Sequence, residues 1–260
     1  MIVLTLLRRV AALVLLPALA FAVWWFATAN SVNPYVPPLQ HILQVFPDTW
    51  GLDRLSSDVL PSVSRLVAGY ALATILGITV GILVGSSRSV RDYLEPLLEF
   101  LRAVPPPVIV PILIVFTGIG SLTKVLVIVA GCVWPILLNT VEGVRAVDGV
   151  LNDTVRCYQI RRISRLRHLV LRSASPQIIA GMRQALSLGI ILMVISEMFA
   201  ASNGLGFTIV QFQRSFAIPQ MWTGIIVLGV IGVVFASSFR VFERKILGWY
   251  FGLRETQRGN

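Results

Sequence analysis

Glu197 is the residue most suited to chemistry, because it is the one acidic side chain deep in an apolar run of this sequence. A carboxylate inside a membrane is costly and usually faces a cavity or a partner. Arg183 lies 14 residues earlier, roughly 21 Å along a helix, so it cannot pair with Glu197 within that helix. Two interpretations stay open for Glu197: contact with a transported molecule, or hydrogen bonding at a structural junction.

Catalytic constellations are absent from the rest of the sequence. There is no G-x-x-x-x-G-K-[ST] phosphate loop and no H-E-x-x-H metal motif. Ser187 and Ser196 have no nearby basic partner of the kind that activates a nucleophile. The two cysteines and two histidines are too scattered to predict a disulfide or a metal site. We therefore expect no catalytic residue, no metal site and no cofactor in this chain, which is not an enzyme.

A basic segment, Glu142–Pro176, is the second candidate for function. It contains seven arginines between two apolar runs, and such loops lie on the cytoplasmic face of a membrane. An apolar stripe at helical spacing predicts a short helix here, formed by Val150, Leu151, Thr154, Val155 and Tyr158. We expect Asp153 near the start of this helix, where its charge suits the helix dipole. The helix could dock on a soluble partner or lie on anionic lipid.

The elements that position these residues are membrane spans. Hydrophobic residues make up 56% of the chain and charged residues only 13%, whereas soluble domains are about a quarter charged. The net charge of +10 is spread between apolar runs, which argues against nucleic-acid binding. A span needs about 20 apolar residues, and six stretches qualify: Leu6–Ala29, Leu66–Ser87, Ala103–Thr123, Val125–Val141, Gln177–Ala201 and Met221–Phe239.

Charge asymmetry sets the predicted orientation. With cytoplasmic N- and C-termini, every Lys and Arg falls inside except Arg54, Arg65, Lys124 and Arg214. A cleavable signal peptide at the N-terminus is the less favoured alternative, because the first apolar run exceeds the usual signal core. The proline-containing segment Asn30–Pro61 would be an external loop, with helices broken by its prolines.

Small residues and prolines mark the packing of the spans. The second span has a small residue at every fourth position, from Gly69 to Gly85. Such a face packs closely on another helix of the same subunit, or forms a seam between subunits. Pro105–Pro107 predicts a helix starting just after Pro105, and Pro135 predicts a buried kink. Both spans could also line a pathway.

Three stretches together resemble the permease subunits of type I ABC importers, in the nitrate, taurine and alkanesulfonate branch. They are Leu97–Pro106, Gly181–Ala185, and Glu197–Phe199 followed by Gly204–Gly206. The resemblance covers about residues 56–248. It implies an all-α membrane protein with six transmembrane helices and a cytoplasmic coupling-helix loop. The whole chain, 1–260, would then be one permease domain: a first span and external loop (1–60), a core (61–248) and a cytoplasmic tail (249–260).

In such permeases the loop carries a motif of the form E-A-A-x-x-x-G, whose helix docks on the ATPase. Its Glu falls here on Asp153, its Gly on Gln159, and a later Pro on Arg172. Gln159 is a marked departure, because the family Gly suits a tight turn. The resemblance implies ATPase coupling through Leu151, Asp153, Thr154, Val155, Arg156, Tyr158, Gln159 and Ile160. A degenerate motif suits either a homodimer with a co-varied ATPase or a heterodimer with a second permease.

The resemblance also implies the partners. A cytoplasmic ABC ATPase dimer would bind ATP and Mg²⁺, and an external substrate-binding protein would deliver a small solute, such as nitrate, a sulfonate or a pyrimidine-like compound. The location would be the bacterial inner membrane. The polar lining of the pathway is predicted as Thr117, Asn139, Ser187, Ser196 and Glu197. An ion-driven transporter and a membrane anchor for a soluble complex are the alternative functions; the former predicts internal repeats, which are not found.

Overall fold

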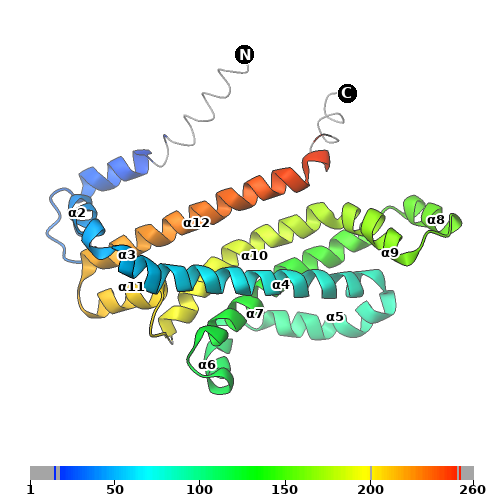
Figure 1. Ribbon diagram of the computed structural model, residues 1–260, viewed down its shortest axis with the longest axis horizontal. Helices are drawn as coiled ribbons and strands as arrows, with labels where there is room; N and C mark the ends of the chain where they lie inside the picture. The colour runs from blue at the N-terminus through cyan, green and yellow to red at the C-terminus, as the bar shows by residue number, and fades with distance from the viewer. Residues whose placement is uncertain (1–14, 16–17, 200, 251, 253–260) are drawn as a thin grey trace, which may run out of the picture.

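The computed structural model describes residues 15, 18–199, 201–250 and 252, and within them the chain forms helices and no strand (Figure 1). A short apolar helix, Ala18–Thr28, comes first. The further elements are α2 (Leu39–Thr49), α3 (Leu52–Arg54), η1 (Leu55–Val59), α4 (Leu60–Ser86), α5 (Arg88–Ala103), α6 (Pro106–Thr117), α7 (Ser121–Arg145), α8 (Gly149–Cys157), α9 (Arg162–Arg165), η2 (Leu166–Val170), α10 (Leu171–Phe199), α11 (Leu205–Arg214) and α12 (Ile218–Ile246). The all-α prediction is confirmed.

Among the described residues, four continuous helical segments are long and apolar enough to cross a membrane. They are Leu52–Ser86, Ser121–Arg145, Arg162–Phe199 and Ile218–Ile246. They contain nearly all of the predicted second, fourth, fifth and sixth spans. Most of the predicted first span, Leu6–Ala29, lies outside the described residues.

The predicted third span, Ala103–Thr123, is wrong as a single straight helix. α5 and α6 meet at a bend of 91°, and α6 ends at Thr117. The cause is the proline run: Val104 and Pro105 are extended, and α6 begins at Pro106, because a proline disfavours helical geometry in the residue before it. The helix start just after Pro105 agrees with prediction. At 12 residues, roughly 18 Å, α6 alone is too short to cross the hydrocarbon core.

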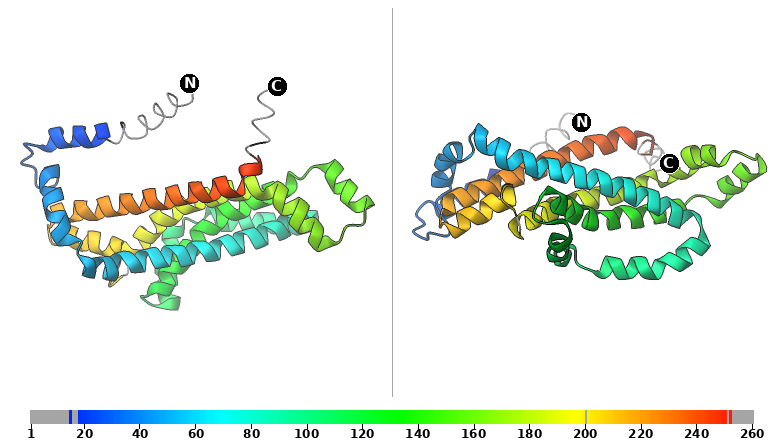
Figure 2. Two further views of the ribbon diagram at one scale, coloured as in Figure 1. Left: turned by 45° about the horizontal axis from the view of Figure 1, so that its top comes forward. Right: turned by 60° about the horizontal axis from the view of Figure 1, so that its bottom comes forward.

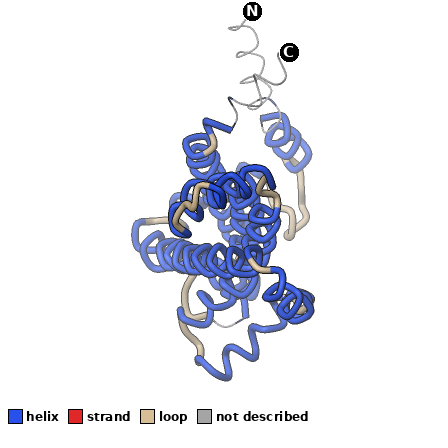
Figure 3. The backbone as a smooth tube through the Cα atoms, turned by 90° about the vertical axis from the view of Figure 1, so that its right-hand side faces the viewer, coloured by secondary structure: helices blue, strands red, loops and turns tan. Residues whose placement is uncertain are grey.

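The axes of the long helices are roughly aligned, with α10 running opposite to α4, α7 and α12, and the core lies between α4, α7 and α10 (Figures 2 and 3). α7 packs along much of its length against both α4 and α10. Half of the most apolar stretch in the α10 segment is buried, against 11% in α12. α12 is therefore a peripheral helix with few buried residues in this subunit.

The small-residue face of α4 packs against α7, which confirms the prediction of packing within one subunit. A Cβ atom added to Gly77 would lie 2.9 Å from the Cβ of Ile136, and one added to Gly81 would lie 2.6 Å from the Cβ of Thr140. Neither position has room for a side chain, so the glycines let the two backbones approach closely.

The segment before α4 is more helical than its prolines predict. Pro38 precedes α2 as expected, but Pro47 lies inside the helix, two residues before its end. Pro47 has no amide hydrogen to donate to the carbonyl four residues earlier, yet α2 continues past it to Thr49. Trp50 then closes the segment against α12, its indole Nε1 donating to Thr223 Oγ1 at 2.8 Å.

Candidate functional site

Glu197 lies at the centre of a buried polar junction. Its side chain is 0% exposed, and Arg65 Nη1 donates to its Oε1 at 2.9 Å. Ser62 Oγ lies 2.7 and 2.8 Å from the two carboxylate oxygens, and the Gly206 amide donates to Oε2 at 3.0 Å. A buried carboxylate is tolerated when it is paired and hydrogen-bonded in this way. The structural interpretation of Glu197 therefore accounts for all of its close contacts among the described residues.

The sequence around the junction explains its geometry. Ser62 and Arg65 are three residues apart, so they lie on one face of α4. Gly204 has φ +118°, and a Cβ there would lie 2.5 Å from the Glu197 carboxylate carbon. Only glycine fits this turn, after which the Leu205 amide donates to Ser62 Oγ and the Gly206 amide donates to the carboxylate. The positive end of that helix then favours the negative charge.

Arg65 extends the junction to two further elements. Its Nη2 donates to Asn203 Oδ1 at 2.6 Å, and its Nε donates to Ser121 Oγ at 3.1 Å. One guanidinium thus joins α4, the start of α7 and the turn after α10. Sequence reasoning excluded Arg183 as partner, correctly, but did not find Arg65. The available signal was that Arg65 and Glu197 were both predicted near the outer ends of their spans.

The other predicted pathway residues lie at separate places. Thr117 Oγ1 donates to Leu113 O at 2.7 Å, and Ser196 Oγ donates to Met193 O at 2.9 Å in the buried core. Asn139 Nδ2 donates to Pro135 O at 2.8 Å and lies 3.5 Å from Gln184 Oε1. Ser187 is exposed and lines a cleft between α10 and α12.

α8 is the other candidate site, and it projects beyond the ends of the long helices (Figure 1). Its cap is Asp148, whose side chain accepts a hydrogen bond from the Leu151 amide at 3.0 Å. Asp153 was expected near the helix start but is the fifth of its nine residues, because the capping aspartate lies five residues earlier. The cap lengthens the helix without moving its apolar face.

The apolar face of α8 is open to solvent in this subunit. Val150 is 75% exposed, Leu151 49% and Tyr158 78%. All the residues predicted to couple to an ATPase are exposed except Val155, which is half-buried: Leu151, Asp153, Thr154, Arg156, Tyr158, Gln159 and Ile160. Arg165 Nη2 donates to Asn152 Oδ1 at 2.8 Å and ties α8 to α9. The helix is thus held by this hydrogen bond through Asn152, while its apolar face is uncovered.

The turn after α8 has a left-handed backbone conformation of the kind that glycine usually adopts, although the residue there is glutamine. Gln159 has φ +51°. Its amide donates to Arg156 O at 3.0 Å, and the Ile160 amide donates to Val155 O at 3.1 Å. These two bonds form a Schellman cap, whose left-handed position glycine usually occupies. The position aligned with the family glycine therefore keeps its left-handed backbone despite the glutamine.

We predict that Gln159→Gly stabilises α8. Relief of the left-handed strain is worth about 1 kcal/mol, so hydrogen exchange of the α8 amides should slow about fivefold. Gln159→Val is the matched control, and should speed exchange because a β-branched residue resists positive φ. Equal exchange rates in all three proteins would contradict the strain at this turn.

The family model described as "Binding-protein-dependent transport system inner membrane component" matches residues 73–248. The chain belongs to this family. It is therefore an inner-membrane transport permease, and the predictions of a permease and of a chain that is not itself an enzyme agree with the family.

Individual relatives place the permease in the expected branch. It is 29% identical to the taurine transport system permease protein TauC of Escherichia coli, over 90% of this chain and 87% of that protein. It is 33% identical to the bicarbonate transport system permease protein CmpB of Synechococcus elongatus, over 79% and 75%. Among solved structures, a chain of the MetNI methionine ABC transporter matches with a TM-score of 0.64 and 17% identity, covering 75% of this permease and 97% of that chain. That match shows the shared importer-permease fold.

Proposed function

We propose that this permease imports a small oxyanion, driven by a cytoplasmic ABC ATPase dimer that docks on α8. The observation behind the ATPase contact is the exposed apolar face of α8, formed by Val150, Leu151 and Tyr158. An exposed face of this kind, beside polar neighbours, is typical of a protein interaction site. Its place between two spans, α7 and the α10 segment, lets a push on the helix reach the membrane.

Coupling follows from the rigidity of this attachment. α8 is joined to α7 by a three-residue connection, 146–148, and to α9 through Arg165 and Asn152. ATP and Mg²⁺ would be bound by the ATPase subunits, whose closure displaces α8. The displacement would pass to α7 and α10, which pack together along much of their length. This is a switch between two arrangements of packed helices, biased by nucleotide at a distance.

The remaining arrangement follows the sequence predictions. The basic α8–α9 region would face the cytoplasm together with both termini, and the α2–α11 end would face the external binding protein. A second permease subunit, identical or related, would complete the pathway. We propose that Asn139 and Gln184 lie on it, because these polar groups of α7 and α10 remain partly exposed in the single subunit. Thr117 and Ser187 are proposed as further lining, whereas the Ser196 and Glu197 side chains are buried within this subunit.

The substrate class rests on the relatives. Taurine carries a sulfonate and bicarbonate is a small oxyanion, so an anionic group with several oxygens is common to both. Such a group is recognised by N–H donors, which the Asn139 and Gln184 side-chain amides can supply. Nitrate and alkanesulfonates fit this class, and a neutral pyrimidine-like compound fits it less well.

The test is transport in proteoliposomes that contain the permease, its ATPase and its binding protein. Uptake of labelled taurine, bicarbonate, nitrate and ethanesulfonate is measured with and without ATP. We expect ATP-dependent uptake of one of these anions and none of uracil. Uptake that follows an ion gradient without ATP would instead support a secondary transporter. Tight ATPase binding without any uptake would support the membrane-anchor alternative.

A further inference from the structure

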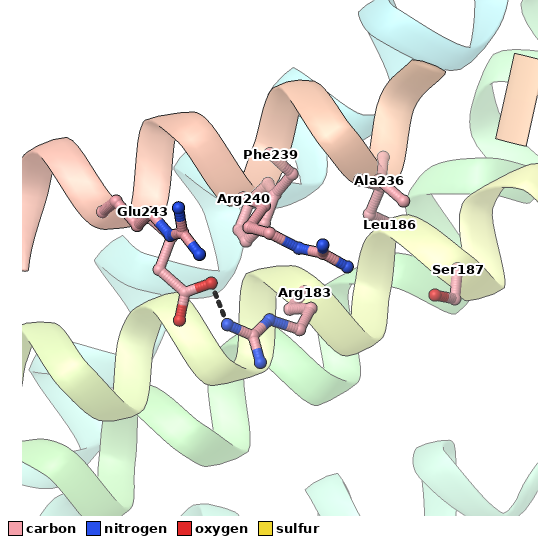
Figure 4. Close-up of a pocket in the computed structure, with 8 residues that line it drawn as sticks. Arg183, Leu186, Ser187, Ala236, Phe239, Arg240 and Glu243 are labelled. Carbon is pink, nitrogen blue, oxygen red and sulfur yellow. Dashed lines mark hydrogen bonds and ion pairs between the residues drawn. The ribbon is translucent and has the colours of Figure 1, made fainter. Parts of the chain in front are cut away.

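A cleft of about 800 Å³ separates α10 from the last turns of α12, at the end of the molecule that carries α8 (Figures 1 and 4). Arg183 and Ser187 line it from α10, and Arg240, Glu243 and Arg244 line it from α12. Figure 4 shows the Arg183 and Arg240 side chains extending into the space between the two helices. The cleft is therefore a concave site with polar groups on both walls.

The cleft has a surplus of positive charge. Arg183 donates to Glu243 in an ion pair, in which the glutamate side chain is 12% exposed and the arginine 59%. The guanidinium thus remains accessible while its carboxylate partner is mostly covered. Across the described part of the chain, Arg240 and Arg244 make no ion pair. Three guanidinium groups against one carboxylate favour an anionic ligand.

The same cleft has an apolar part beside the charges. Leu186, Ala236 and Phe239 also line it, and in the sequence they lie deeper in their spans than Arg183 and Glu243. Arg240 and Arg244 come just after the predicted end of the sixth span at Phe239, which is the depth of lipid headgroups. The Arg183 side chain reaches the same level, where it pairs with Glu243. Near the same end, the Arg172 guanidinium lies 5.8 Å from the Trp249 ring centre, and such aromatic residues mark membrane interfaces.

We propose that this cleft binds an anionic phospholipid, with the phosphate held by Arg183, Arg240 and Arg244 and an acyl chain along Leu186 and Phe239. Charge complementarity identifies the headgroup, and the peripheral position of α12 gives access from the bilayer. This inference rests on the orientation given under Proposed function, which places the cleft in the cytoplasmic leaflet, where anionic lipids are found. It concerns a site separate from α8 and from the Asn139–Gln184 pair, although the cleft shares Ser187 with the proposed pathway lining.

The experiment is native mass spectrometry of the purified full chain in detergent, titrated with phosphatidylglycerol or phosphatidylcholine. We expect phosphatidylglycerol to bind more tightly than phosphatidylcholine. The double variant Arg240→Gln/Arg244→Gln should bind phosphatidylglycerol about 30-fold more weakly, since each basic group contributes about a fivefold effect. Glu243→Gln should bind it more tightly, because a negative charge is removed. Arg88→Gln, at an exposed arginine outside the cleft, should bind like the wild type.

Each other outcome overturns the proposal. Equal binding of the two lipids, or equal binding by all variants, would show that the cleft does not select anionic lipid. Displacement of phosphatidylglycerol by millimolar inorganic phosphate would identify a free-anion site. Crosslinking of a Ser187→Cys variant to a second copy of the chain would show that a neighbouring subunit fills the cleft. Because binding is measured without transport, a failed transport assay leaves this test unaffected.

Discussion

Replacing Leu151 and Tyr158 together with aspartate is expected to release the ATPase and abolish transport. Both side chains are exposed on α8, so the substitutions leave the fold of the permease intact. At a docked interface each loses an apolar contact and buries a charge, about 2 kcal/mol apiece. Affinity for the ATPase should therefore fall about a thousandfold. The measurement is co-purification of the ATPase with tagged permease, followed by ATP-dependent uptake.

Tyr93→Asp is the matched control, because Tyr93 is 89% exposed on α5, outside α8. It should retain the ATPase, and thermal unfolding of all the variants in detergent should coincide. An ATPase that remains bound to the double aspartate variant would show that docking does not use α8. The scaffold and ion-driven alternatives would then gain support.

Removing Arg65 is expected to be the most destabilising single change in the described core. Arg65→Met leaves the fully buried Glu197 carboxylate without its cation, and also removes the bonds to Asn203 and Ser121. Breaking one side of a buried ion pair costs about 3–5 kcal/mol. The measurement is denaturant unfolding of the purified permease, together with its yield in membranes.

Two variants separate this effect from a general loss of charge. Arg102→Met breaks an ion pair with Glu99 in which both side chains are more than half exposed, and should cost at most about 1 kcal/mol. The double variant Arg65→Met/Glu197→Leu should recover part of the loss, because no unpaired charge remains buried. Similar stabilities of Arg65→Met and Arg102→Met would refute the role of the junction.

Features that depend on neighbouring residues, such as the spans and the small-residue face of α4, could be predicted from the sequence. Hydropathy located the spans that contain α4, α7, α10 and α12, and the four-residue glycine repeat identified the face of α4 that packs on α7. The proline run gave the start of α6. The proline run did not predict the 91° bend between α5 and α6, because neither prolines nor hydropathy specify the direction of the following helix.

Of the candidate sites, the one on α8 could be predicted from the sequence, and the other two could not. The apolar stripe of α8 is periodic, so sequence alone located it, and the family motif located Gln159 at the position with positive φ. The Arg65–Glu197 pair joins residues 132 positions apart, and no local pattern encodes such a pairing. The α10–α12 cleft is likewise a product of tertiary packing, in which single arginines on separate helices converge.

The separation of Arg65 and Glu197 also has a consequence for biogenesis. Synthesis at 5–20 residues per second leaves an interval on the order of ten seconds between the emergence of the arginine and that of its partner. During that time the nascent α4 contains an unneutralised cation, which it can keep at the bilayer surface because Arg65 lies near the end of the helix. Final closure of the bundle therefore waits for α10 and the turn through Gly204. Until then Arg65 lacks the carboxylate that pairs with it in the folded permease.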